Sequence, residues 1–194
     1  FLPLKPDQVP SFGFDAAAYW FKLNIKNPGR QVKWFLEVAY PPLDEIQIFY
    51  KDSLDNWVSK KSGDIFPISS REVPYHHFVF PISVLGNDSE IYIRLKTTSS
   101  VQLPLTIWSP EKFYESASQL QFANGIFYGI LLIMIFYNLF LYFSVRDLST
   151  LYYIITLFTG VNVIAFFQGY GFFYLYPEWP ALNHTFTIIS GPLF

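Results

Sequence analysis

The chain has 194 residues, of which 52% are hydrophobic, 21% aromatic and only 14% charged, and its net charge at pH 7 is −2. The near-neutral net charge gives no indication of a nucleic-acid partner, and the apolar composition excludes a disordered chain. The absence of cysteine excludes disulfides and cysteine-ligated zinc. Charged residues are distributed unevenly, because only Arg146, Asp147 and Glu178 lie beyond the first 121 residues. We therefore expect a water-soluble part followed by a part that requires lipid.

Residues 19–108 contain short segments in which apolar and polar residues alternate, a pattern typical of β-strands. Turn-forming residues such as Asn27-Pro28-Gly29 and Gly86-Asn87-Asp88 separate these segments. Roughly seven or eight short strands with such turns predict an antiparallel β-sandwich within residues 1–109. Pro81 predicts an edge strand, since proline has no N–H to donate. The predicted strands cover residues 19–25, 32–38, 45–50, 57–58, 78–84, 91–95 and 103–108, with an irregular loop over 59–77.

A helix is expected to follow the last strand directly. Ser109-Pro110-Glu111 has the pattern of a helix start, with serine as the N-cap, proline at the first helical position and an acid next. No helix-breaking residue follows before Gln121, so we predict one helix from about Pro110 through the membrane to about Ser144, with residues 110–121 as a helical junction. Such a stiff helix would pass a displacement of the soluble part into the first membrane span.

Two charge-free apolar runs predict membrane-spanning helices. Residues 122–144 form a run of about 23 residues and residues 151–176 one of about 26, each long enough for a helix to cross a hydrocarbon layer of about 30 Å. The alternative, two buried helices of a soluble core, is disfavoured because both runs are apolar on every helix face. A third run from about residue 185 to Phe194 is too short to cross, so we expect a fragment of a longer multi-pass membrane protein.

No arrangement of residues typical of a catalytic or metal site occurs in the sequence. The histidines are His76, His77 and His184, and the adjacent pair would point to opposite faces of a strand, which disfavours a shared metal ion. Phosphate-binding glycine loops and the HExxH and GxSxG motifs do not occur. We therefore expect no enzymatic activity in this chain, no cofactor and no metal.

A sugar-type binding site would need aromatic faces for stacking and planar polar groups that bind hydroxyls. Trp57 and the segment with Tyr75 and His77 are favoured, because they lie at predicted loop edges, where binding residues gather. The alternatives are that Trp20 packs within the sandwich, as Trp34 would, and that the two arginines lie at the surface or pair with Asp44 and Asp64. The full set of candidate ligand-binding residues is Trp20, Trp57, Arg71, Tyr75, His77 and Arg94.

Four residues in the apolar runs are candidates for helix packing. Asn138 and Asn162 could each donate a hydrogen bond across helices, worth about 1 kcal/mol, or bond within their own helix. Gly125 and Gly129 form a GxxxG pattern that permits close backbone approach, either within a helix bundle or at a homodimer contact.

Motifs along nearly the whole chain resemble, in order and spacing, those of one family. The chain resembles the bacterial seven-transmembrane receptors with diverse intracellular signalling modules (7TMR-DISM), and its soluble part is similar to their second type of extracellular domain. The matching stretches of the soluble part are Ala18-Tyr19-Trp20, Tyr40-Pro41-Pro42-Leu43-Asp44, Gly63-Asp64, Phe78-Val79-Phe80-Pro81, Ile91-Tyr92-Ile93-Arg94 and Ile107-Trp108-Ser109-Pro110. Those of the apolar part are Gly125–Gly129, Tyr137-Asn138-Leu139-Phe140, Arg146-Asp147, Leu151-Tyr152-Tyr153, and Gly169 and Gly171 followed by Tyr176-Pro177.

The resemblance implies an all-β jelly-roll domain, similar to carbohydrate-binding modules, on the periplasmic side of the bacterial inner membrane. Residues 1–109 would be this sensor domain, and residues 122–194 the start of a seven-helix bundle. A cytoplasmic histidine kinase, diguanylate cyclase or phosphatase module would lie beyond the chain. We expect a receptor that binds a small molecule, such as a saccharide, or a partner protein. The rival functions are a membrane-anchored binding or assembly module without signalling output, and an envelope enzyme whose sandwich presents substrate.

Overall fold

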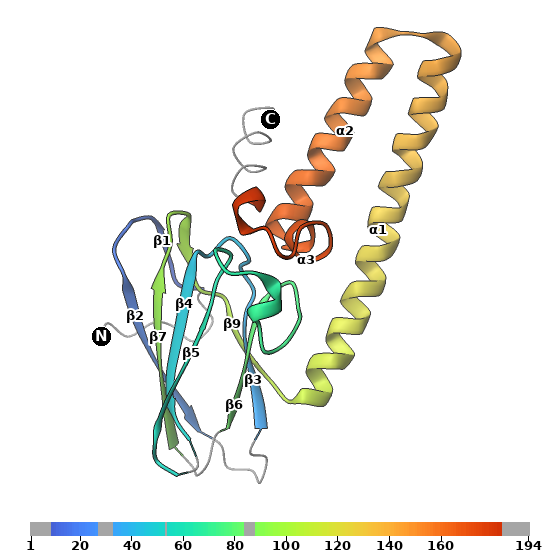
Figure 1. Cartoon of the computed structure of the whole chain (residues 1–194). Coiled ribbons are helices and arrows are strands. Elements are labelled where there is room, and N and C mark those ends of the chain that lie inside the picture. The colour runs from blue at the N-terminus through green and yellow to red at the C-terminus, as the bar shows by residue number, and fades with distance from the viewer. Residues whose placement is uncertain (1–8, 27–32, 53, 84–87, 184–194) are drawn as a thin grey trace.

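The computed structural model describes residues 9–26, 33–52, 54–83 and 88–183. The predicted turn over 27–29, most of the turn over 86–88, His184 and the third apolar run lie outside these residues. A β-sandwich forms one end of the molecule, and two long antiparallel helices rise from it side by side (Figure 1). The predicted all-β domain followed by apolar helices is therefore confirmed.

Within the described residues, three antiparallel sheets make up the sandwich. The four-stranded sheet has the order β2 (Tyr19–Lys26), β7 (Asp88–Lys96), β4 (Glu45–Lys51) and β5 (Trp57–Ser62). The three-stranded sheet has the order β6 (Phe78–Ser83), β3 (Lys33–Val38) and β9 (Leu105–Trp108). A small third sheet pairs β1 (Ser11–Phe14) with β8 (Ser100–Gln102).

The core lies between the two larger sheets, because alternate residues of their strands point at one another. Ile46 and Ile48 of β4 face this core, and their register partners on β7 are Leu95 and Ile93. Each buried aliphatic side chain of this size contributes about 1.5–3 kcal/mol, so the period-two pattern is what drives the strands into this arrangement. The largest fully buried side chains are Phe78, Leu36, Leu43, Ile46, Ile48, Ile82, Ile91, Ile93, Leu95, Leu103, Val38 and Val101.

One edge strand is longer than the sequence pattern predicts, because its second half is polar. β5 continues to Ser62, into the segment predicted as a loop, because Lys60 and Lys61 weaken the apolar signal of a strand that pairs on one side only. A 3₁₀ turn, Ile68–Ser70, interrupts the remainder of that loop. Pro81 lies in β6, which is an edge strand of its sheet as predicted.

The helix α1 (Pro110–Val145) begins and ends where the sequence predicts. The Ser109 side chain accepts a hydrogen bond from the Lys112 N–H at 3.3 Å, and Arg146 ends the helix in the left-handed conformation. With 36 residues, α1 is about 54 Å long, far more than the ~30 Å hydrocarbon layer requires. Its first turns therefore lie beside the sandwich, where Phe113 and Ala117 are buried.

The second predicted span is too long, because α2 (Leu148–Phe167) ends well before Tyr176. Gly169 follows with φ +75°, and a short helix, α3 (Tyr170–Tyr174), begins there. Of the residues after Phe167, Tyr170 and Phe172 are buried within the chain, with Phe172 facing Arg71 of the sandwich, whereas Tyr174 and Leu175 are exposed. Hydrophobicity alone does not distinguish these two environments.

The helices α1 and α2 are each long and apolar enough to cross a membrane. Their apolar windows are almost entirely unburied within the chain, at 0% and 6%. A core helix of a soluble protein would instead be covered by its own chain. This finding favours lipid, or further helices, as their surroundings.

We predict that Gly169→Ala destabilises the chain. A Cβ at this position would lie 2.7 Å from the His76 carbonyl oxygen and 2.9 Å from the Pro41 side chain, and φ +75° is unfavourable for alanine. The expected loss is about 1–3 kcal/mol, measured as a lower Tm in detergent or nanodiscs. Gly129→Ala is the matched control, since nothing lies within 4 Å of a Cβ there. Equal Tm values for both variants would contradict the close packing at Gly169.

Candidate functional site

The six predicted ligand residues separate into two groups in space. Trp20, Trp57 and Arg94 lie on strands of the four-stranded sheet, at positions that point away from the core. Arg71, Tyr75 and His77 instead lie in the β5–β6 connection, which faces the helices. The two locations offer different chemistry, so each is described by itself.

The first location, here called the outer aromatic face, consists of Trp20, Phe49, Trp57 and Tyr92. Trp20 stacks on Phe49 with ring centroids 5.6 Å apart and an interplanar angle of 23°. Trp57 lies beside Tyr92 with centroids 5.9 Å apart. Trp20 is 50% and Trp57 60% exposed, so both indoles present open surface to solvent. The interpretation of Trp20 as a packing residue of the core is therefore wrong.

Charged groups surround this face. The Lys22 ammonium lies 5.6 Å from the Tyr92 ring centroid, and the Lys51 ammonium lies 5.8 Å from that of Trp57. Arg94 pairs with Glu45 and with neither of the aspartates considered above, and Lys61 contacts the same carboxylate at 3.0 Å. Lys61 and Arg94 hold the pKa of Glu45 below its ordinary value, so this carboxylate is ionised at neutral pH.

Phe49 and Tyr92 are members of this face that the sequence analysis does not single out. Each occupies an outward position between two inward-facing residues of its strand. The sequence signal for each of these two residues is an aromatic side chain at an outward position of a strand. The aromatic residue that each one contacts can be identified only from the strand order, because neighbouring strands in the order β2, β7, β4 and β5 are not all consecutive in the chain.

The second location, here called the junction, is where the β5–β6 connection meets residues 168–183. Arg71 organises its sandwich side, since its Nη1 donates to the carbonyl oxygens of Tyr75 at 2.7 Å and of His76 at 3.3 Å. The guanidinium carbon lies 4.6 Å from the Phe78 ring centroid. Burial lowers the pKa of Arg71 to about 10, opposed by the nearby Asp64, so the arginine stays charged at neutral pH.

Tyr75 packs on the start of α1, and His77 binds Glu37 within the sandwich. The Tyr75 ring meets Phe113 of α1 edge-on, with centroids 5.0 Å apart. His77 Nδ1 lies 2.6 Å from Glu37 Oε1, and Trp108 Nε1 donates to the other oxygen of Glu37 at 2.6 Å. Because Tyr75 is buried and His77 is engaged with Glu37, they offer a ligand little open surface. The structure places Tyr75 in the packing against α1 and His77 in an interaction with Glu37.

His76 lies between them and contacts α3. Its ring stacks on Tyr170 with centroids 4.3 Å apart and an interplanar angle of 19°. The residue is 3% exposed. Burial, with the nearby His77 and Arg71, lowers the pKa of His76 to about 3, so the imidazole is neutral at physiological pH.

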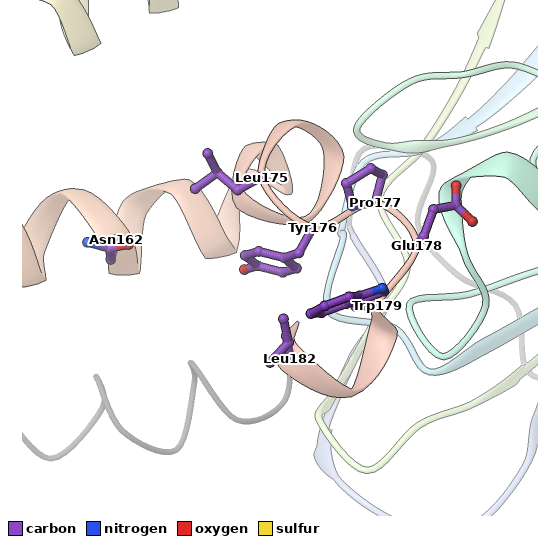
Figure 2. A pocket seen from close by; sticks show the side chains of 7 residues that line it. All are labelled: Asn162, Leu175, Tyr176, Pro177, Glu178, Trp179 and Leu182. Atoms are coloured by element: carbon purple, nitrogen blue, oxygen red, sulfur yellow. The ribbon is translucent and has the colours of Figure 1, made fainter.

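A cavity of about 450 Å³ lies between α2 and the segment that follows α3 (Figure 2). Its walls are mainly apolar, and the Glu178 carboxylate points away from the other labelled side chains towards the sandwich (Figure 2). Such walls suit an apolar side chain or acyl chain better than a polar ligand. The lining residues are Asn162, Leu175, Tyr176, Pro177, Glu178, Trp179 and Leu182.

The predicted packing residues Asn138 and Asn162 form hydrogen bonds along their own helices. Asn138 donates to the Met134 carbonyl and Asn162 to the Phe158 carbonyl, each within its own helix. A Cβ on Gly125 or on Gly129 would meet nothing within 4 Å. The expected bonds across these two helices are therefore not formed, because i−4 carbonyls satisfy both amides. Packing of these four residues against other helices, or in a homodimer, stays a prediction.

Other polar residues connect the helices near the junction. Asn124 of α1 donates to the Tyr170 hydroxyl at 2.9 Å. The Tyr128 hydroxyl of α1 donates to Gln168 Oε1 at 2.8 Å. Among the residues that the structure describes, no three His, Cys, Asp or Glu side chains gather as a metal site would require.

Two family models match the chain. The model described as 7TMR-DISM extracellular 2 matches residues 3–109, and the model described as 7TM diverse intracellular signalling matches residues 120–194. The first match covers the β-sandwich, and the second covers most of α1 with all of α2 and α3. A search of curated proteins finds no match. The resemblance expected from the sequence motifs is confirmed.

We predict that His76 makes the chain less stable in acid. Its pKa is about 3 in the folded state against an ordinary value of 6.5, so below pH 6.5 the unfolded state binds the proton and the folded state does not. The free energy of unfolding should fall by about 1 kcal/mol per pH unit from pH 6.5 towards pH 3. His76→Phe keeps a ring against Tyr170 and should remove this contribution. Thermal unfolding of the unaltered chain and of His76→Phe at pH 7 and pH 5 measures this contribution. Equal losses of stability between the two pH values in both proteins would contradict the assignment to His76.

Proposed function

The chain belongs to the 7TMR-DISM family of membrane sensor receptors, and we propose that its β-sandwich binds a saccharide on the outer aromatic face. The sandwich would lie on the periplasmic side of a bacterial inner membrane. Binding would be passed through the membrane helices to a cytoplasmic signalling module. The match of residues 3–109 to an extracellular domain model supports this orientation.

The outer aromatic face is the observation that carries the proposal. Isolated exposed aromatic residues are ordinary, but here two aromatic pairs, one stacked and one tilted, present indole surface from four strands on one side of a sheet. The C–H faces of a pyranose ring stack on such surfaces. Arg94 and Glu45 at its margin supply a donor and an acceptor in fixed geometry for sugar hydroxyls.

Transmission requires that the ligand bind two receptor states with different affinity. A factor of about 100 between the states provides roughly 2.7 kcal/mol of bias. The continuous helix α1 supports such transmission, because it starts directly after β9 and its first turns are packed on the sandwich through Phe113 and Ala117. A displacement of the sandwich therefore displaces the outer part of α1.

We predict that Trp57→Ala and Trp20→Ala each raise the Kd for a bound oligosaccharide about tenfold or more, since each removes a stacking surface worth about 1.4 kcal/mol or more. The measurement is calorimetric titration of the chain in nanodiscs with a panel of soluble oligosaccharides. Phe14→Ala is the matched control, because Phe14 is an 82% exposed aromatic residue on β1, away from this face.

Two outcomes would refute this part of the proposal. If no oligosaccharide of the panel binds, the saccharide class is wrong, and a protein partner becomes the better hypothesis for the same face. If an oligosaccharide binds to all three variants with the same Kd as to the unaltered chain, the ligand site lies elsewhere on the molecule.

A further inference from the structure

The sandwich touches the membrane part at two separate places. One is the start of α1, where Phe113 packs on Tyr75. The other is the segment over residues 168–183, which leads out of α2 and carries α3. Figure 1 shows α3 lying between the sandwich and the outer end of α2. A receptor that passed its signal through α1 alone would have no need of the second contact.

Tyr170 is the residue at which these parts meet. Its ring stacks on His76 of the sandwich, with centroids 4.3 Å apart. Its hydroxyl accepts the hydrogen bond from Asn124 of α1 at 2.9 Å, and its ring meets Tyr128 of α1 at 83°. One side chain at the start of α3 thus contacts both the sandwich and α1.

Further contacts hold the sandwich to the same segment. The guanidinium carbon of Arg71 lies 5.8 Å from the Phe172 ring centroid, on α3. The Ile68 N–H donates to the Pro177 carbonyl oxygen at 2.8 Å. The Ser69 hydroxyl donates to the Glu178 carboxylate at 2.9 Å, and the Asn183 amide donates to Asp64 at 3.2 Å.

These contacts are specific in direction and position. Hydrogen bonds and ring stacks lose their energy over small displacements, whereas apolar packing allows sliding. Gly169 lets the backbone of this segment approach the His76 carbonyl as closely as it does. The connection between α2 and α3 is therefore held in one position on the sandwich.

We infer that Tyr170 is a positioning residue that ties α1 and the C-terminal end of α2 to the sandwich as one unit. The chain runs from the sandwich into α1, back through α2 to Tyr170, and there returns to the sandwich. Tilting of the sandwich must then move α1 and α2 together or break the His76–Tyr170 stack. The role of Tyr170 in signalling rests on the transmission proposed above. The attachment of the helices to the sandwich does not depend on a ligand.

The attachment can be measured without ligand or output. The natural chain has no cysteine, so Ser59→Cys on β5 and Ser149→Cys on α2 allow two spin labels at exposed positions. Pulsed electron paramagnetic resonance in nanodiscs then gives the distance distribution between the sandwich and the far end of α2. We expect one narrow peak in the labelled parent, and loss of that narrow peak in Tyr170→Ala.

Two further variants keep the result interpretable. His76→Ala removes the same stack from the sandwich side and should broaden the distribution in the same way, even if Tyr170→Ala fails to fold. Tyr137→Ala is the matched control, since Tyr137 is an exposed tyrosine on α1, and its peak should stay narrow. A narrow parent-like peak in both His76→Ala and folded Tyr170→Ala would overturn the inference. Failure of saccharide binding would leave this result unaffected, so the two proposals fail separately.

Discussion

The stacking of Tyr170 on the His76 imidazole is the contact on which the arrangement of sandwich and helices depends. Burial keeps this imidazole neutral, and the backbone at Gly169 takes a conformation that only glycine permits without strain. Arg71 fixes the carbonyl groups around His76 and also faces Phe172. The interactions at the junction therefore support one another, and loss of one weakens the rest.

The outer aromatic face and the junction carry different chemistry, and this separation suits a sensor. The outer aromatic face is open, with Trp20 and Trp57 half or more exposed. The junction is closed, and its histidine is neutral and buried. The core between them is a close packing of aliphatic and aromatic side chains, which favours motion of the sandwich as a single body.

Local patterns predict the strands well but not their assembly. Alternation along β4 and β7 identifies Ile48 and Ile93 as core residues, and the Ser109-Pro110 start of α1 follows from capping chemistry. The outer aromatic face depends on a strand order that brings β2 next to β7, which no local pattern encodes. The second span was overestimated for a related reason, since Tyr170 and Phe172 are as apolar as lipid-facing residues but lie against protein.

Solid-state NMR of the chain in lipid bilayers, with histidine and tyrosine rings isotopically labelled, tests the central contact most directly. His76→Phe assigns the His76 signal by its loss. The structure predicts a neutral imidazole at pH 6 with a cross-peak to the Tyr170 ring. A protonated His76 whose cross-peaks lead to water and not to a tyrosine ring would contradict the account.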